Sequence, residues 1–347
     1  MRLADGLSHH KILNMNPKSP RIPTRDSGGS FSLNNPDDGT PIKEMFTLGD
    51  GLLFITEKCT YRVQVADQID PERKNPALPH NVQQKLFDHG TASQLLCNTL
   101  LLGKVMFRKE FLKIEVDRAM QLAFEALGEL VAMHDAAQNF KSAEQAALRK
   151  AAQSPKHGRS LAIPSVGNVR AHCKTFMQKA DHFAGILLNI ARLFYPDQRQ
   201  MNWDNAHALV KAKYGEDDNF TKVMMHATPL LKLVRNARDC LEHRNEGVTT
   251  TDFQLEQNGT IAPPTIAIDF RQTSHERCPV SSFMEGAEKA LLDSFEIIVV
   301  HLCSKHVQPF AGCPIVVSLL PENYRTAWHV RFGYGMYYQA GQFAPIG

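Results

Sequence analysis

Hydrophobic and polar positions follow different periods in different parts of the chain. Residues 1–41 follow none, because proline and glycine interrupt them and apolar residues are few. Such a segment cannot form its own core, so we expect an extended arm that orders only on contact with another surface. The apolar residues of the arm that we expect to act as anchors are Ile12, Leu13, Ile22 and Phe31. From Met45 to Val65, short runs of Phe, Ile, Val and Tyr between turn residues predict two or three strands.

Helical spacing governs most of the remaining chain. The run from Phe111 to Met133, continued by Ala-rich sequence to Ala152, predicts one long amphipathic helix. A Pro/Gly/Ser-rich segment follows, which is typical of a domain boundary or a mobile loop. Apolar positions then recur over Val169–Phe194, and the pattern stops before Pro196.

Two further long helices are predicted in the C-terminal half. The first spans about Phe220 to Arg244, with Pro229 at a start or a kink, so that it forms one kinked helix or two pieces. The second follows a capping-box pattern, Ser282 with Glu285, and extends to His306.

Strand patterns interrupt and follow these helices. Asn258-Gly259 lies between two alternating stretches within residues 249–270, which predicts an inserted β-hairpin, and the last residues are rich in Val, Phe and Tyr. The expected fold class is mainly α with small β additions (α+β). Its expected parts are an arm (1–41), a β element with long helices that could bind a regulatory partner (42–155), a helical bundle (165–310) and terminal strands (311–347).

Composition narrows the functional classes. The chain has 347 residues, 39 basic and 36 acidic, so the net charge of +3 does not by itself imply nucleic-acid binding. Its seven cysteines are never spaced as CxxC, which predicts neither a disulfide framework nor a zinc ribbon. No apolar run is long enough to span a bilayer and no signal peptide pattern is present, so we expect a cytoplasmic protein.

The segment from Leu230 to Glu246 carries the strongest candidate chemistry. On a helix, its apolar residues share one arc, while Arg235, Arg238, Asp239 and His243 fall on the opposite arc. Between Lys222 and Arg244 there are five basic and two acidic residues, so a polyanion could dock there. The simpler interpretation is a solvated helix face with weak i,i+4 ion pairs between Arg235 and Asp239, or Arg238 and Glu242.

A family resemblance favours the first interpretation. The hexapeptide Arg238-Asp239-Cys240-Leu241-Glu242-His243 resembles the R-[N/D/H]-x-x-x-H signature of the HEPN superfamily of α-helical RNA-cleaving domains. The long predicted helices on either side are similar to the helical bundle of that family, over roughly residues 165–307. The predicted hairpin departs from the minimal bundle, and the first 160 residues have no assigned counterpart.

The resemblance implies metal-independent endoribonuclease activity, in which the RNA 2′-hydroxyl attacks the adjacent phosphate. His243 would be the acid/base and Arg238 the phosphate clamp, and Asp239 would orient one of them. The expected auxiliary RNA contacts are Arg235, Asn236 and Arg244. Family members usually pair two such helices across a homodimer, and the implied biological role is the toxic effector of a prokaryotic defence or abortive-infection system. The alternative is a catalytically silent HEPN-like binding or oligomerisation subunit.

No metal or other cofactor is expected. His301, Cys303 and His306 have metal-binding atoms, but positions 301 and 303 lie about 200° apart on a helix, which favours a partly buried helix end over a shared metal. Common nucleotide-binding, zinc-protease and serine-hydrolase motifs do not occur. The expected partners are therefore an RNA substrate, a second copy of the chain, and a possible regulatory protein.

Overall fold

The computed structural model describes most of the chain in two compact units, Met1–Ala92 and Ser93–Gly347. The residues described are 21–26, 33, 39–153, 161–198, 200–243, 246–271, 273–338 and 341–347. The expected arm anchors Ile12, Leu13 and Phe31, and the candidate RNA contact Arg244, lie outside them.

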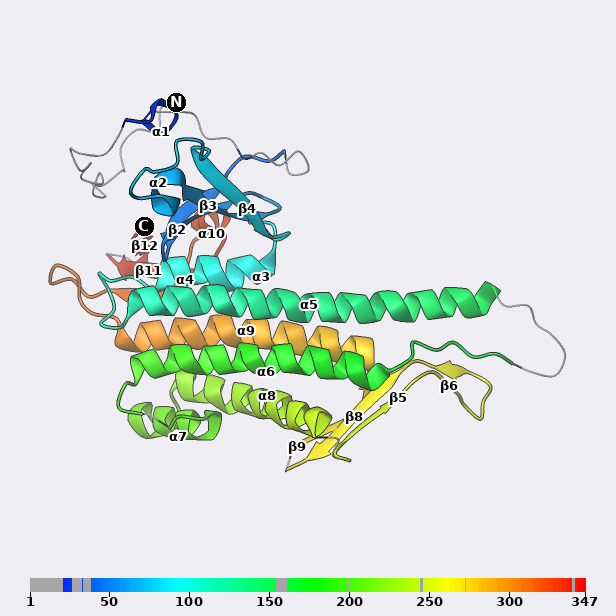
Figure 1. Cartoon of the computed structure of the whole chain (residues 1–347). Helices are drawn as coiled ribbons and strands as arrows, with labels where there is room; N and C mark the ends of the chain where they lie inside the picture. The colour runs from blue at the N-terminus through cyan, green and yellow to red at the C-terminus, as the bar shows by residue number, and fades with distance from the viewer. Residues whose placement is uncertain are drawn as a thin grey trace. The chain divides into compact units, whose positions relative to one another are not determined.

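The first unit is built on a four-stranded antiparallel sheet in the order β1-β2-β3-β4 (Figure 1). The strands are β1 Glu44–Leu48, β2 Gly51–Ile55, β3 Thr60–Val65 and β4 Asn81–Phe87, and the short helix α2 spans Ala66–Ile69. Alternation along β2 and β3 places Phe54, Tyr61 and Val63 in one buried cluster. Three strands lie where the sequence predicts strands. The fourth strand, β4, follows a proline-rich loop and was not predicted.

The part of the arm that the structure describes is anchored by charge as well as by apolar contact. The short helix α1, Pro23–Asp26, follows Ile22, which is buried as expected. Arg25, whose side chain is 2% exposed, pairs with Asp67 and Asp70 at 3.3 and 3.1 Å. A buried arginine is stable only when carboxylates neutralise it, so these ion pairs fix the segment 21–26 on the first unit.

The second unit is a bundle of four long helices, each antiparallel to the one before it in the sequence (Figure 1). They are α5 Val116–Gln153, α6 Val169–Phe194, α8 Asn219–Glu242 and α9 Val280–His306. The connection between α6 and α8 contains α7, Trp203–Tyr214. Before α5 come α3 Gln94–Leu96, a π-helical turn at Cys97–Leu101, and α4 Leu102–Met106.

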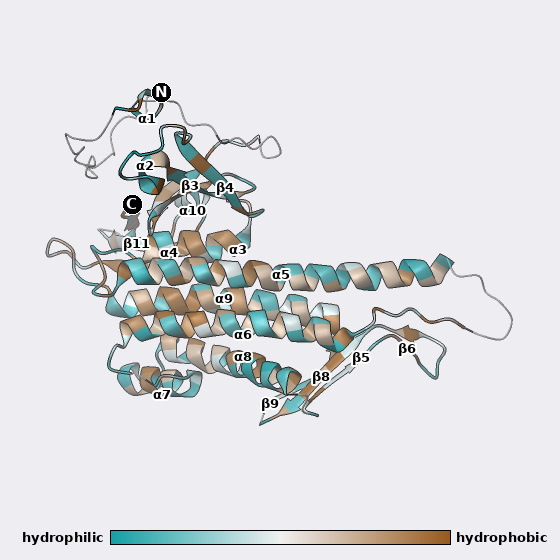
Figure 2. Ribbon diagram, viewed as in Figure 1, coloured by the Kyte–Doolittle hydropathy of each residue, from teal (hydrophilic) through white to brown (hydrophobic). Residues whose placement is uncertain are grey.

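The bundle buries one face of each long helix. α6 contributes Phe176, Phe183 and Leu187, all fully buried, and Asn168 caps its first turn through the Ala171 N–H. Hydropathy colouring shows α4 and much of α9 as apolar (Figure 2). α8 is one helix rather than two pieces, with the exposed Pro229 inside it. In the ranges described, no helix combines the length and apolar character that crossing a bilayer requires.

Small β elements complete the second unit. The strands β5 Val248–Thr251, β8 Thr265–Phe270 and β9 Thr273–Pro279 form one antiparallel sheet between α8 and α9. The strands β6 Gln254–Leu255 and β7 Ile261–Ala262 form the hairpin predicted around Gly259, whose φ is +81°. A terminal sheet contains β10 Val316–Leu319, β11 Phe332–Tyr337 and β12 Phe343–Pro345, with α10 Glu322–Trp328 before β11.

A buried carboxylate holds the terminal sheet to the bundle. Glu296 on α9 is 1% exposed and accepts hydrogen bonds from Arg331 (Nε to Oε1, 2.9 Å) and from Asn98 (3.2 Å). The Tyr334 hydroxyl donates to the Met106 carbonyl at 2.8 Å. The C-terminal strands therefore belong to the same packed unit as the helices.

The overall class agrees with the sequence prediction of a mainly α protein with small β additions. The boundary between the two compact units lies between Ala92 and Ser93 in the sequence, within the predicted part 42–155. The helix α5, which the prediction grouped with the N-terminal β element, packs along α6 and α9. Its apolar stripe is buried there, so the bundle begins well before residue 165.

Acid should release the segment 21–26 from the first unit. A hydrogen bond from Arg73 holds the pKa of Asp26 below its usual range, and backbone N–H donors, with Arg25, lower the pKa of Asp70. A depressed folded-state pKa adds stability that is complete above the ordinary aspartate pKa and is lost as the pH falls through the folded value. The protection factors of the backbone amides in the segment 21–26 should be constant from pH 7 to pH 5 and should fall below about pH 4. Loss of protection between pH 7 and pH 5 would contradict this account.

Candidate functional site

The C-terminal end of α8 is held by Arg170 on α6, and Gly247, beyond that end, lies against β8. Arg170 on α6 donates from Nη2 to the Cys240 carbonyl (3.0 Å) and from Nη1 to the Val248 carbonyl (2.9 Å). The Cys240 carbonyl is one of the last four in α8, which have no hydrogen-bond partner within the helix. Gly247 lies so close to β8 that a Cβ there would be 2.9 Å from the Asp269 carbonyl oxygen. Arg170 therefore ties the end of α8 to the start of β5.

Arg238 is fixed by two carboxylates. Its Nε and Nη2 both donate to Oδ2 of Asp181 on α6, at 2.9 and 2.8 Å, and its Nη1 lies 3.1 Å from Oδ1 of Asp239. The hydrogen bond to Asp181 raises the pKa of Arg238. The Arg238 side chain is 32% exposed, so solvent reaches part of it.

Asp239 joins Arg238 to a second arginine. Its Oδ2 lies 3.3 Å from Nη1 of Arg271, which follows β8 in the turn to β9. The Arg271 side chain is 63% exposed, and its guanidinium carbon lies 4.7 Å from the centre of the Phe270 ring. The predicted orienting role of Asp239 has a geometric basis, since its carboxylate holds both guanidinium groups.

His243 follows the last residue of α8 and caps it. Its backbone N–H donates to the Asp239 carbonyl at 3.0 Å, and its side chain is exposed. The preceding residue, Glu242, accepts a hydrogen bond from Gln178 and pairs with Lys174 at 3.2 Å. The bond from Gln178, followed by Lys174, lowers the pKa of Glu242. The exposed imidazole therefore follows directly on Glu242, whose side chain is held by α6.

The predicted auxiliary contacts have different environments. Arg235 is exposed on α8. Asn236 is only 8% exposed, and its Nδ2 donates to the Thr273 hydroxyl on β9 at 2.7 Å. The side chain of Asn236 faces inward and joins α8 to β9, an environment that does not favour the predicted RNA contact.

The expected local excess of positive charge is offset by other elements. Lys232 pairs with Asp204 on α7 at 3.0 Å, and Arg238 pairs with Asp181 on α6. The described residues do not form either of the predicted i,i+4 ion pairs. Arg238 pairs instead with the adjacent Asp239, and Glu242 pairs with Lys174 on α6. The polar face is a network between helices rather than a simple solvated stripe.

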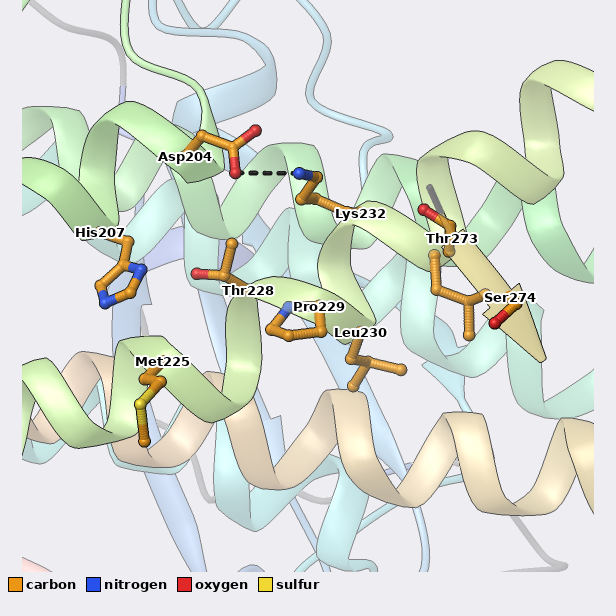
Figure 3. Close-up of a pocket in the computed structure, with 10 residues that line it drawn as sticks. Asp204, His207, Met225, Thr228, Pro229, Leu230, Lys232, Thr273 and Ser274 are labelled. Atoms are coloured by element: carbon orange, nitrogen blue, oxygen red, sulfur yellow. Dashed lines mark hydrogen bonds and ion pairs between the residues drawn. The ribbon is translucent and has the colours of Figure 1, made fainter. Parts of the chain in front are cut away.

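A cavity lies farther back along α8 (Figure 3). It has a volume of about 610 Å³ and is open to solvent, and Asp204, Lys232 and Leu230 line it. A neighbouring hollow of about 350 Å³ shares Leu230 and Leu233 and is bordered by Phe283. Arg238 and His243 line neither of these two cavities.

The three candidate ligands on α9 face separate partners. His301 stacks on Phe220, and Cys303 is fully buried with its thiol directed at the Met106 carbonyl. His306 packs against the rings of Phe194 and Tyr195. Throughout the described ranges, no group of three or more His, Cys, Asp or Glu side chains is arranged to hold a metal ion.

Comparison with protein-family models, with curated proteins and with solved structures finds no match to this chain. The candidate site is therefore defined by its own geometry.

Three residues that support the site were not predicted. Asp181 and Arg170 lie on α6, and Arg271 lies beyond the predicted hairpin strand. Asp181 precedes Arg238 by 57 positions, so no local spacing connects the two. The only signal was that Asp181 lies on a helix expected to pack beside the motif helix.

Replacement of Asn236 should change stability rather than RNA affinity. Asn236→Ala leaves the Thr273 hydroxyl without its partner and should lower the free energy of unfolding by about 1 to 3 kcal/mol. Urea denaturation measures this change. The exposed Asn205→Ala is the control and should alter it by less than about 0.5 kcal/mol. Unchanged stability together with weaker RNA binding would instead support the predicted RNA contact at Asn236.

Proposed function

We propose that this protein is a metal-independent endoribonuclease of HEPN type, and that the polar face of Arg238, Asp239 and His243 performs the cleavage. The observation that carries the proposal is the placement of an exposed histidine immediately after a helix whose last turns present a fixed, partly exposed arginine. The resemblance of the same residues to the HEPN signature supports it, as does the bundle of long helices around them.

The proposed chemistry uses the properties of these side chains. The RNA 2′-oxygen attacks the adjacent phosphorus, the bond to the 5′-oxygen breaks, and a 2′,3′-cyclic phosphate remains. One proton must leave the 2′-hydroxyl and another must reach the departing 5′-oxygen, and an imidazole can perform either transfer near neutral pH. Arg238 would stabilise the extra charge on the phosphate oxygens. Since Asp181 already fixes its orientation, little side-chain freedom is lost on binding.

A homodimer would complete the site. Base and acid must act on opposite sides of the reacting phosphate, and two His243 side chains from two protomers would supply one each. The exposure of His243 supports this arrangement. As the family resemblance implies, the biological role would be that of a toxic or defensive effector.

A second candidate function rests on the charge balance at Arg238. Two carboxylates share its guanidinium, and Arg271 shares the second of them, so these four groups sum to zero charge. Such neutralisation suits a structural network in a catalytically silent binding or oligomerisation subunit. The two candidates differ in whether His243 changes a rate.

The catalytic proposal is tested by removing the imidazole. His243→Ala should lower the cleavage of single-stranded RNA by at least about 100-fold in buffer containing EDTA, because a general acid/base is lost. The melting temperature should not change, since this side chain is exposed. His226→Ala, at an exposed histidine within α8, is the matched control and should cleave at the parent rate. Equal rates for all three proteins, or a strict need for Mg²⁺, would reject the catalytic role.

The assembly is tested separately by light scattering. At micromolar concentration the mass should be about twice that of one chain. A monomer that retains full RNA-cleaving activity would exclude the shared site while leaving the cleavage itself in place.

A further inference from the structure

The turn between β8 and β9 has an unusual residue at its tip. Phe270 and Thr273 pair across the hairpin, so the turn is only two residues long. Arg271, its first residue, has a φ of +47°. Two-residue hairpin turns with positive φ favour Asn, Asp or Gly, and a bulky residue held there is strained. Residues held in strained backbone conformations of this kind cluster at functional sites.

The side chain of Arg271 has a defined orientation despite its exposure. One contact places its guanidinium near the face of the Phe270 ring, 4.7 Å from the ring centre. A second contact, from Nη1 to Asp239 at 3.3 Å, directs it toward the polar face at the end of α8. The Arg271 side chain as a whole is 63% exposed, so a ligand can reach it.

From these contacts we infer that Arg271 is a stacking platform for an unpaired base of the RNA bound at the Arg238–His243 face. This inference rests on the proposed function and names its substrate class as single-stranded RNA. Planar guanidinium groups and aromatic rings stack on bases without regard to sequence, and bases in a duplex are not free to do so. Arg271 shares Asp239 with Arg238, so a base held there lies next to the proposed phosphate clamp.

The turn offers a variant that separates this role from a structural one. Asn fits the left-handed backbone better than Arg, so Arg271→Asn should keep or raise the melting temperature. The lost ion pair is exposed and contributes little to stability. Arg271→Lys keeps the charge but removes the planar surface. Arg118→Asn, at an exposed ion pair on α5, controls for the loss of one positive charge.

Binding is measured in a His243→Ala background, so that the RNA stays intact, with a labelled single-stranded RNA of about a dozen nucleotides. Arg271→Asn and Arg271→Lys should each weaken binding at least about fivefold, the low end for loss of a stacked base, and Arg118→Asn should not. The parent should bind the same RNA less tightly when it is annealed into a duplex.

Each other outcome overturns a stated part. Parent-like affinity in Arg271→Lys would show that charge and not stacking is used, and parent-like affinity in Arg271→Asn would remove the residue from the site. Either result, together with RNA cleavage by the unaltered protein, rejects this inference and leaves the proposed function. Absence of both RNA binding and cleavage in the unaltered protein rejects both.

Discussion

The pairing of Arg238 with Asp181 is the interaction on which the candidate site depends. Two donors of one guanidinium converge on a single carboxylate oxygen of the neighbouring helix, at 2.9 and 2.8 Å. The contact fixes α8 against α6 at the turn where the motif begins. It also leaves Nη1 of Arg238 directed at Asp239, whose other oxygen reaches the hairpin. Three elements that are distant in sequence are thereby joined at one polar face.

The charges of this face decide how it can be used. Arg238, Arg271, Asp181 and Asp239 balance one another, so the local excess of basic residues in the α8 sequence does not become a strongly cationic surface. Under the proposed function, a phosphate approaching Arg238 would meet a positioned donor rather than a general positive field. Attraction over long distances would then be weak, and under the proposed function RNA recognition would depend on short-range geometry and stacking.

The sequence predicts the helices of this fold well, because their apolar faces repeat at helical spacing. The predicted Val169–Phe194 coincides with α6, and the motif helix is found at Asn219–Glu242. The strand β9 was not predicted, since the turn at Arg271 lacks the Asn or Gly that normally marks a hairpin. The inward orientation of Asn236 was also missed. Its burial depends on that hairpin, which supplies Thr273.

Local sequence patterns could not predict which side chains pair across elements that are distant in the sequence. Arg170 and Asp181 are ordinary polar residues of an amphipathic helix until the packing places them beside the end of α8. The same holds for Arg25 in the first unit, where an arm expected to dock by apolar anchors also uses ion pairs to Asp67 and Asp70. Periodicity shows which side of a helix is polar. It does not show which charge on another element will face it.

The most direct measurement of the central claim is the identity of the ends that the protein leaves on single-stranded RNA in the presence of EDTA. Mass spectrometry of the products should show 2′,3′-cyclic phosphate ends with the unaltered protein, because attack by the 2′-hydroxyl requires only the side chains of this face. Products ending in 3′-hydroxyl groups, or RNA that remains uncut by purified protein, would contradict the assignment of catalysis to Arg238 and His243.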